Sequence, residues 1–170
     1  MKAKPLPPLE ELKEFLDYNP DTGIFTWIKK PHARIKVGQV AGSKISNGYL
    51  QMQLKGINYY AHRLAYYMYH GVDPLEKCID HIDGDKANNK INNLRLASNA
   101  QNCMNRVNLS INNTSGVRGV CWDKFYKKWR GVIMINGEQK HLGYFINIED
   151  AIKVRKEAEI KYFGDFCGKD

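Results

Sequence analysis

The 170-residue chain carries a formal net charge of +8, which favours a polyanionic partner such as nucleic acid over a membrane surface. Four scattered cysteines form no CxxC pair, which argues against a zinc ribbon and against a disulfide framework: Cys78, Cys103, Cys121 and Cys167. Because the sequence has no long apolar run and no signal-peptide core, we expect a soluble protein of a reducing cytoplasm.

The N-terminal part predicts one helix and one strand. Residues 1–8 (MKAKPLPP) form a short basic arm, after which apolar residues recur at helical spacing: Leu9, Leu12, Phe15 and Leu16. We assign residues 1–17 to this arm and its core-packing helix. Residues 18–23 (YNPDTG) predict a turn, and residues 24–27 (IFTW) predict an aromatic strand.

The segment of residues 29–48 is rich in lysine, glycine and serine. It is either a solvated loop or an arm that contacts a nucleic-acid backbone through its five cations: Lys29, Lys30, Arg34, Lys36 and Lys44. Residues 49–60 then alternate apolar and polar side chains around Lys55-Gly56, which predicts a β-hairpin. A helix is predicted at 61–70, closed by Gly71. We interpret its His62 as a packing or phosphate-contacting residue.

The stretch of residues 77–106 (KCIDHIDGDKANNKINNLRLASNAQNCMNR) concentrates side chains that ligate metals or transfer protons. Its apolar start predicts a short strand, so Asp80 and His81 lie where that strand runs out into a loop. Asp83-Gly84 predicts a tight turn, and the asparagines at 88–93 predict a compact loop.

The second half of this stretch predicts a strand and a helix start. Leu94 and Leu96 place apolar side chains on one face of the strand. Ser98 and Gln101 have the spacing of a capping box, which indicates a helix beginning at Ser98. The predicted order is strand, loop, strand and helix, with Asp80, His81, Asn93 and Asn102 converging.

These four residues resemble the HNH endonuclease motif of the ββα-metal fold. The phrase DHIDGDKANNKINNLRLASNAQN is especially similar to HNH proteins of phages and mobile introns. The resemblance implies that His81 is the general base that activates water and that Asn93 orients this histidine. It also implies that Asp80 and Asn102 ligate a metal ion. Many family members have histidine at the position of Asn102, so the preferred metal stays open.

The implied chemistry agrees with the residue types. Oxygen ligands from Asp and Asn suit Mg²⁺ or Mn²⁺ better than Zn²⁺. Such an ion stabilises charge on the departing 3′ oxygen, while a histidine that titrates near neutrality takes a proton from water. A purely structural Asp-His pair in an asparagine-rich turn is the alternative, and the family spacing of several independent features disfavours it.

After a polar linker at 107–116 (VNLSINNTSG), the chain predicts a second module. Strands are expected at 117–122, 128–135 and 139–145, with Asn136-Gly137 as a hairpin turn. A helix capped by Asn147 follows and ends at Gly164. The helix residues expected to pack on the sheet are Ile148, Ala151, Ile152, Ala158 and Tyr162.

The run from Ser115 to Phe166 resembles the plant ethylene-response-factor (APETALA-type, AP2/ERF) DNA-binding domain, which also occurs appended to phage HNH nucleases. Between Arg118 and Lys140 six cations and two carboxylates leave a net charge of +4. A sheet with that face fits a major groove. The residues assigned to DNA contact are Arg118, Trp122, Lys124, Lys128, Trp129, Arg130 and Lys140, together with Arg95 of the first module. Alternatively, both tryptophans belong to the core and the lysines solvate an edge.

The predicted fold class is α+β: a ββα-metal HNH nuclease domain at 18–106, the linker, and an AP2/ERF-like module at 117–170. The predicted function is metal-dependent, site-selective cleavage of double-stranded DNA to 5′-phosphate and 3′-hydroxyl ends. We expect a monomer in a bacterial host cell, encoded by a phage or mobile element. Two alternatives stay open: a sequence-specific DNA-binding protein with an inactive nuclease centre, and an RNA-directed nuclease.

Overall fold

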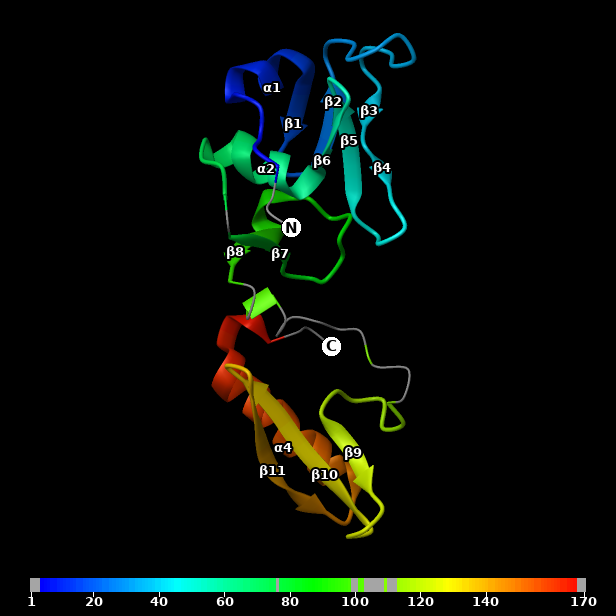
Figure 1. The fold of residues 1–170 in the computed structure, drawn as a ribbon, viewed down its shortest axis with the longest axis vertical. Coiled ribbons are helices and arrows are strands. Elements are labelled where there is room, and N and C mark those ends of the chain that lie inside the picture. Colours follow the sequence, from blue (N-terminus) through cyan, green and yellow to red (C-terminus); the bar gives the residue numbers. More distant parts are fainter. Residues whose placement is uncertain (1–3, 76, 99–100, 103–108, 110–112, 168–170) are drawn as a thin grey trace. The chain divides into compact units, whose positions relative to one another are not determined.

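The computed structural model describes residues 4–75, 77–98, 101–102, 109 and 113–167. The chain divides into two compact units, Met1–Asn102, with several small antiparallel sheets and helices, and Cys103–Asp170, with one antiparallel sheet and the helix α4 (Ile148–Phe163) (Figure 1). Within the described residues, no helix combines the length and the apolar character needed to cross a membrane.

The first unit begins with a helix and a three-stranded sheet. Helix α1 (Leu9–Phe15) runs into strand β1 (Leu16–Asn19), which pairs with β2 (Ile24–Trp27), and β3 (Val40–Ala41) pairs with the other edge of β2. The predicted helix and the predicted strand at 24–27 are confirmed. The sequence does not predict β1, because Leu16 fits the spacing of the preceding helix and Asp17 and Asn19 are weak strand formers.

A second sheet of the first unit leads into helix α2. Strands β4 (Ser43–Lys44), β5 (Leu50–Leu54) and β6 (Ile57–Tyr60) form a meander, and α2 (Ala61–His70) follows directly. Lys55 and Gly56 both have positive φ, 49° and 79°, as a two-residue hairpin turn requires, so the predicted hairpin is confirmed. The loop interpretation of 29–48 is wrong where β3 and β4 lie, because these two-residue strands depend on backbone pairing rather than on a side-chain pattern.

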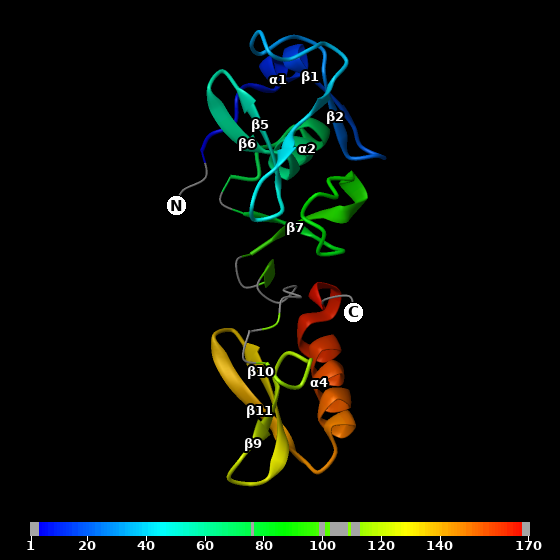
Figure 2. The same cartoon turned by 90° about the vertical axis from the view of Figure 1, so that its right-hand side faces the viewer.

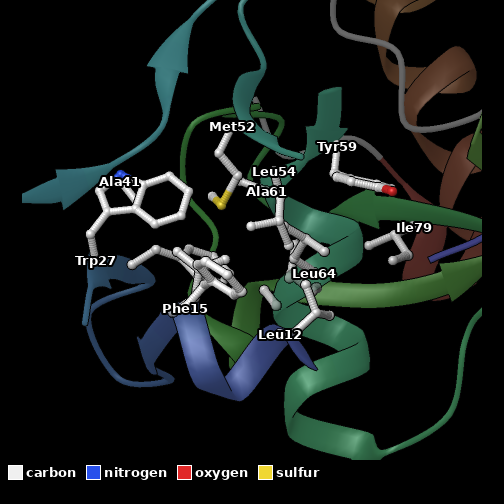
Figure 3. Packing of buried hydrophobic residues seen from close by; sticks show 14 residues of the cluster. Leu12, Phe15, Trp27, Ala41, Met52, Leu54, Tyr59, Ala61, Leu64 and Ile79 are labelled. Atoms are coloured by element: carbon white, nitrogen blue, oxygen red, sulfur yellow. The ribbon is translucent and has the colours of Figure 1, made fainter. Parts of the chain in front are cut away.

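The core of the first unit gathers side chains from both sheets, both helices and the strands of the candidate site (Figure 3). Leu12 and Leu64 are fully buried, and a buried leucine contributes roughly 1.5–3 kcal/mol to stability. Ile79 and Leu94 belong to the same cluster, so the strand pair described next is anchored in the core. The cluster comprises Leu12, Phe15, Leu16, Phe25, Trp27, Ala41, Met52, Leu54, Tyr59, Ala61, Leu64, Ala65, Ile79 and Leu94.

The order of strand, loop, strand and helix start predicted for residues 77–106 is present in the part that the structure describes. Strand β7 (Cys78–His81) pairs antiparallel with β8 (Leu94–Ala97), and the 3₁₀ turn η1 (Ile91–Asn93) precedes β8. The capping box is confirmed: Gln101 N donates to Ser98 Oγ over 3.2 Å, and Ser98 N donates to Gln101 Oε1 over 2.8 Å. Residues 103–106 of the predicted helix lie outside the described residues.

The second unit is a three-stranded sheet with a helix on one face (Figure 2). Strands β9 (Val120–Asp123), β10 (Lys128–Ile135) and β11 (Glu138–Phe145) lie in the order β11-β10-β9, and α4 (Ile148–Phe163) and the 3₁₀ turn η2 (Gly164–Phe166) follow. The predicted strands, helix and hairpin turn are confirmed. Asn147 is the N-cap residue of α4, as predicted, but its side chain donates to Asp150 Oδ2 over 3.5 Å and makes no capping hydrogen bond to the backbone.

Candidate functional site

The strand pair β7–β8 buries the acidic and imidazole side chains of the candidate site. Asp80 and His81 are each 4% exposed, at the point where β7 enters the loop of residues 82–90. Directly across the ladder stand Arg95 opposite Asp80 and Leu94 opposite His81. A carboxylate and an imidazole are thus held next to each other on an element that is fixed by the hydrophobic core.

Asp80 is paired with a cation from the neighbouring strand. Arg95 Nη2 lies 2.7 Å and Arg95 Nε 2.9 Å from the same carboxylate oxygen, Asp80 Oδ2. Because both side chains are largely buried, the guanidinium offsets much of the free energy lost when the carboxylate leaves water. The structure therefore places Arg95, which we assigned to DNA contact, beside the candidate metal ligand.

Asn89 holds the ring of His81 in one orientation. The side chain of Asn89 is 1% exposed, and its Oδ1 lies 3.2 Å from His81 Nε2. Its Nδ2 donates to Ala87 O over 3.2 Å, so the amide is oriented with the oxygen facing the imidazole. This contact favours the tautomer of neutral His81 that has its proton on Nε2 and its lone pair on Nδ1.

The other side of His81 is lined by rings. His62, from the first turn of α2, lies edge-on to His81 with a centroid distance of 5.3 Å, and Tyr49 lies 5.9 Å away. Burial lowers the pKa of His81, against the hydrogen bond to Asn89 and the nearby aspartates, which raise it. Burial also lowers the pKa of His62, to about 3, so both rings are neutral near pH 7.

Asn93 braces the loop that follows His81. Its Nδ2 donates to Asp83 Oδ1 over 2.9 Å and to Asn88 O over 2.9 Å, and its Oδ1 accepts from Asp83 N over 3.1 Å. Its backbone carbonyl accepts from Ile82 N over 2.9 Å, one residue after His81. Burial opposes ionisation of Asp83, but hydrogen bonds from Asn88 and Asn93 outweigh it and lower the pKa of this carboxyl.

Asn102 is the last of the four motif residues. It is half-buried and helical, and its backbone N–H donates to Ser98 O over 2.9 Å. The helix start after β8 thus carries the second candidate metal ligand, as the ββα order requires. Ser98 caps the turn that holds Asn102, so the cap couples the position of this ligand to the end of β8.

The second unit does not bring all the predicted DNA contacts onto one face. Ile133 packs with Ala158 and Phe163 of α4, so alternate β10 residues on its side, Trp129 included, face the helix. Trp122 is the direct partner of Trp129, with ring centroids 5.3 Å apart, and Lys140 donates to Tyr162 of α4 over 2.6 Å. Trp122, Trp129 and Lys140 therefore share the side of the sheet that carries α4.

The opposite side of the sheet, here called the open face, carries Lys128 and Arg130. Arg130 stands across from Cys121 on β9 and from Tyr144 on β11. Further aromatic groups gather beside it, since the ring centroids of Tyr126 and His141 lie 4.6 Å and 4.7 Å from that of Tyr144. Of the remaining candidates, Lys124 is exposed in the β9–β10 turn and Arg118 is half-buried before β9.

Sequence reasoning missed the surroundings of three buried polar residues. The sequence predicts Asn89 only as part of a compact loop, and nothing in the asparagine run distinguishes it from Asn88 or Asn93. The placement of His62 against His81 depends on tertiary packing. Arg155 lies on the core side of α4 at 2% exposure, where charge would have predicted solvent.

In the comparisons with known proteins, a family match covers the residues of the candidate site. Residues 59–104 match the HNH endonuclease family. Over 69 residues the chain is 41% identical to "Protein 3.8" of Escherichia phage T7; the alignment covers 41% of this chain and 56% of the phage protein. The chain thus spans about half the length of the curated relative that it matches. No solved structure matches significantly. Residues 59–104, which carry Asp80, His81, Asn93 and Asn102, are an HNH endonuclease domain.

Proposed function

We propose that the chain is a metal-dependent, site-selective DNA endonuclease of the homing HNH type. It would hydrolyse phosphodiester bonds to 5′-phosphate and 3′-hydroxyl ends. The observation that carries the proposal is the buried Asp80-His81 pair at the end of β7, inside the residues that match the HNH family. The family match supports a nuclease, and the geometry around His81 supports a catalytically active one.

His81 is the proposed general base. Asn89 fixes the Nε2–H tautomer, so Nδ1 takes the proton from the attacking water. Burial favours the neutral ring, which is the form that accepts a proton, and a positioned base typically contributes about 10²–10⁴-fold to the rate. Asn93 is proposed to support this geometry indirectly, by bracing the loop and the residue after His81.

Asp80 and Asn102 are the proposed ligands of Mg²⁺ or Mn²⁺. Across the described ranges, no three His, Cys, Asp or Glu side chains are grouped to hold a metal ion. One carboxylate and one amide oxygen fit hard divalent ions, which keep several waters and bind substrate phosphate. When bound, the ion would stabilise the negative charge that develops on the departing 3′ oxygen.

The second unit is proposed to be a DNA-binding module of the ethylene-response-factor type. The net positive charge of residues 118–140 supports this, and the open face offers Lys128 and Arg130 beside the rings of Tyr126, His141 and Tyr144. Cations would contact phosphates and the aromatic and guanidinium groups would reach bases. Binding of duplex DNA should therefore weaken steeply as salt is raised.

A second function is favoured by the contacts of Asp80. Two nitrogens of Arg95 already occupy Asp80 Oδ2, at 2.7 Å and 2.9 Å. A guanidinium in this place could substitute for the metal permanently, which would make the chain a sequence-specific DNA-binding protein with an inactive nuclease centre. The two functions differ in whether a divalent ion can bind at Asp80 beside Arg95.

The deciding experiment is nicking of supercoiled plasmid by the full chain in Mg²⁺, Mn²⁺ and EDTA. Wild type is compared with His81→Ala, and with His70→Ala as a matched control at an exposed histidine of the same unit. Cutting that requires metal, survives in His70→Ala and disappears in His81→Ala supports the nuclease.

The other outcomes are equally informative. Equal cutting by His81→Ala would overturn the assignment of the base. Absence of cutting on any duplex, together with salt-sensitive binding, would support the inactive-centre alternative. Cutting of RNA with no cutting of duplex DNA would replace the DNA substrate by RNA.

A further inference from the structure

The end of β1 and the turn that follows it, residues 18–23 and here together called the β1–β2 turn, lie directly against the loop that carries Asn89. Tyr18 Oη donates to Asn89 O over 2.8 Å, and Ile91 N donates to Pro20 O over 3.0 Å. These two hydrogen bonds join backbone groups on either side of Lys90 to a segment about 70 residues earlier in the chain. The β1–β2 turn thus fixes the backbone at the residue whose side chain holds His81.

Gly23 brings the two segments into contact closer than any other residue would allow. Its φ is +73°, and a Cβ at this position would lie 2.5 Å from Lys90 N and 2.6 Å from the carbonyl carbon of Asn89. Both of these atoms belong to the backbone, so a side chain here would have to displace the loop. The turn itself is stabilised by Asn19, whose Oδ1 accepts from the backbone N–H groups of Asp21 and Thr22 at 3.0 Å each.

We propose that the β1–β2 turn is a positioning element for the general base, with Tyr18 and Gly23 as positioning residues that act through Asn89 on His81. The proposal rests on the proposed nuclease function. It adds to the HNH domain a segment that lies outside the matched residues 59–104. Residues 18–23 were predicted only as a turn, and the strand pair β7–β8 does not itself contain the contacts that hold Asn89.

A small displacement of the Asn89 backbone would be transmitted directly to the ring of His81. Asn89 is 1% exposed, and its carbonyl is held by Tyr18 while its side-chain oxygen meets His81 Nε2 at 3.2 Å. A backbone shift of a few tenths of an ångström at Asn89 would lengthen that contact beyond hydrogen-bond distance. The imidazole would then lose its fixed tautomer and orientation, which lowers the rate of the chemical step rather than DNA binding.

Tyr18 is suited to this role because it is a lasting donor. Burial, and then the charge of Asp21, raise the pKa of its hydroxyl to about 12, so the group keeps its proton under all working conditions. Its ring is fixed by Phe25 of β2, at a centroid distance of 4.6 Å and an interplanar angle of 30°. Removing the hydroxyl alone therefore leaves the ring packing in place.

The test compares Tyr18→Phe with Tyr66→Phe, a matched control whose ring packs on His70 of α2 in the same unit. Tyr18→Phe in the full chain is expected to lower kcat about three- to tenfold, the range for one uncharged hydrogen bond, with KM unchanged and no effect in the control. In an Asn89→Ala background, Tyr18→Phe should cause no further loss. An equal loss in both backgrounds would show that Tyr18 acts independently of Asn89 and would overturn the proposal.

A second readout needs no cleavage. Long-range ¹H–¹⁵N spectra of the histidine rings report the tautomer of His81 directly. Wild type and Tyr66→Phe should show a single Nε2–H form, and Tyr18→Phe and Gly23→Ala should show mixed tautomers. If wild type does not cut DNA, the proposed function fails, and this spectrum alone decides the positioning role. A His81 spectrum unchanged in Tyr18→Phe would overturn the positioning role even in an active nuclease.

Discussion

His62 is expected to make the first unit lose stability in mild acid. Its imidazole is 9% exposed, and burial, followed by the charges of His81 and Arg63, lowers its pKa from 6.5 to about 3. In the unfolded chain the same ring titrates near 6.5. Between these two values the unfolded state binds more protons than the folded state, so the free energy of unfolding falls as the pH falls.

The size of the effect follows from the interval between the two pKa values. At pH 5 the solution is about 1.5 pH units below the unfolded pKa and still above the folded one. At about 1.4 kcal/mol per unit, the first unit loses about 2 kcal/mol relative to pH 7. A loss of that size is a large part of the 5–15 kcal/mol that is typical of a domain. Above pH 6.5 the full stability is present and the effect vanishes.

The assay is urea unfolding at pH 7 and pH 5, read by the fluorescence of Trp27, which is 3% exposed in the first core. Replacing Trp122 and Trp129 by phenylalanine confines the signal to this unit. His62→Phe keeps a ring against Tyr60 but cannot titrate, so its loss at pH 5 should be smaller than that of the parent by about 2 kcal/mol. His32→Phe, at an exposed histidine, should behave as the parent. Identical losses in His62→Phe and the parent would refute the reasoning.

Four further predictions concern the two sites and the second core. Asp80→Asn should abolish metal-dependent cutting while binding in a gel-shift assay persists; retained cutting would exclude Asp80 as a ligand. Asn89→Ala should lower kcat roughly 10–100-fold in plasmid nicking with little change in KM, and an unchanged kcat would contradict its contact with His81. Lys128→Ala should reduce the slope of log affinity against log salt concentration by about one. A slope equal to that of wild type would show that the open face does not contact DNA. Gly119→Ala should destabilise the second unit in urea by more than about 1 kcal/mol, because a Cβ there, at φ +76°, would lie 2.3 Å from the carbonyl oxygen of Val132; wild-type stability would contradict this close approach.

The elements that sequence predicted correctly are those whose signals are local. Lys55-Gly56 and Asn136-Gly137 specify their hairpins because both residues of each turn have positive φ. Ser98 and Gln101 fix a helix start through two short hydrogen bonds between near neighbours. Strands β3 and β4 were missed because two residues carry no period and are defined by their partners in β2 and β5.

The candidate site was predictable in composition but not in contacts. The motif spacing identified Asp80 and His81, and the structure buries both. Which asparagine meets the histidine could not be read from the run at 88–93, because the answer depends on how the loop closes onto the β1–β2 turn. The sequence also does not predict on which side of the sheet Trp122 and Trp129 lie. Alternation along a strand shows which residues share a side, but it does not show which side the helix covers.

The pair of Asp80 and Arg95 separates folding from metal binding. In small zinc domains the metal supplies much of the folding free energy, and chelation unfolds the chain. Here a guanidinium from the adjacent strand compensates the buried carboxylate across the β7–β8 pair, so the charge of Asp80 does not depend on a metal for its balance. The first unit is therefore expected to keep its fold in EDTA. The proposed metal site would then be preformed, so the supply of divalent ions would affect cleavage activity but not the amount of folded protein.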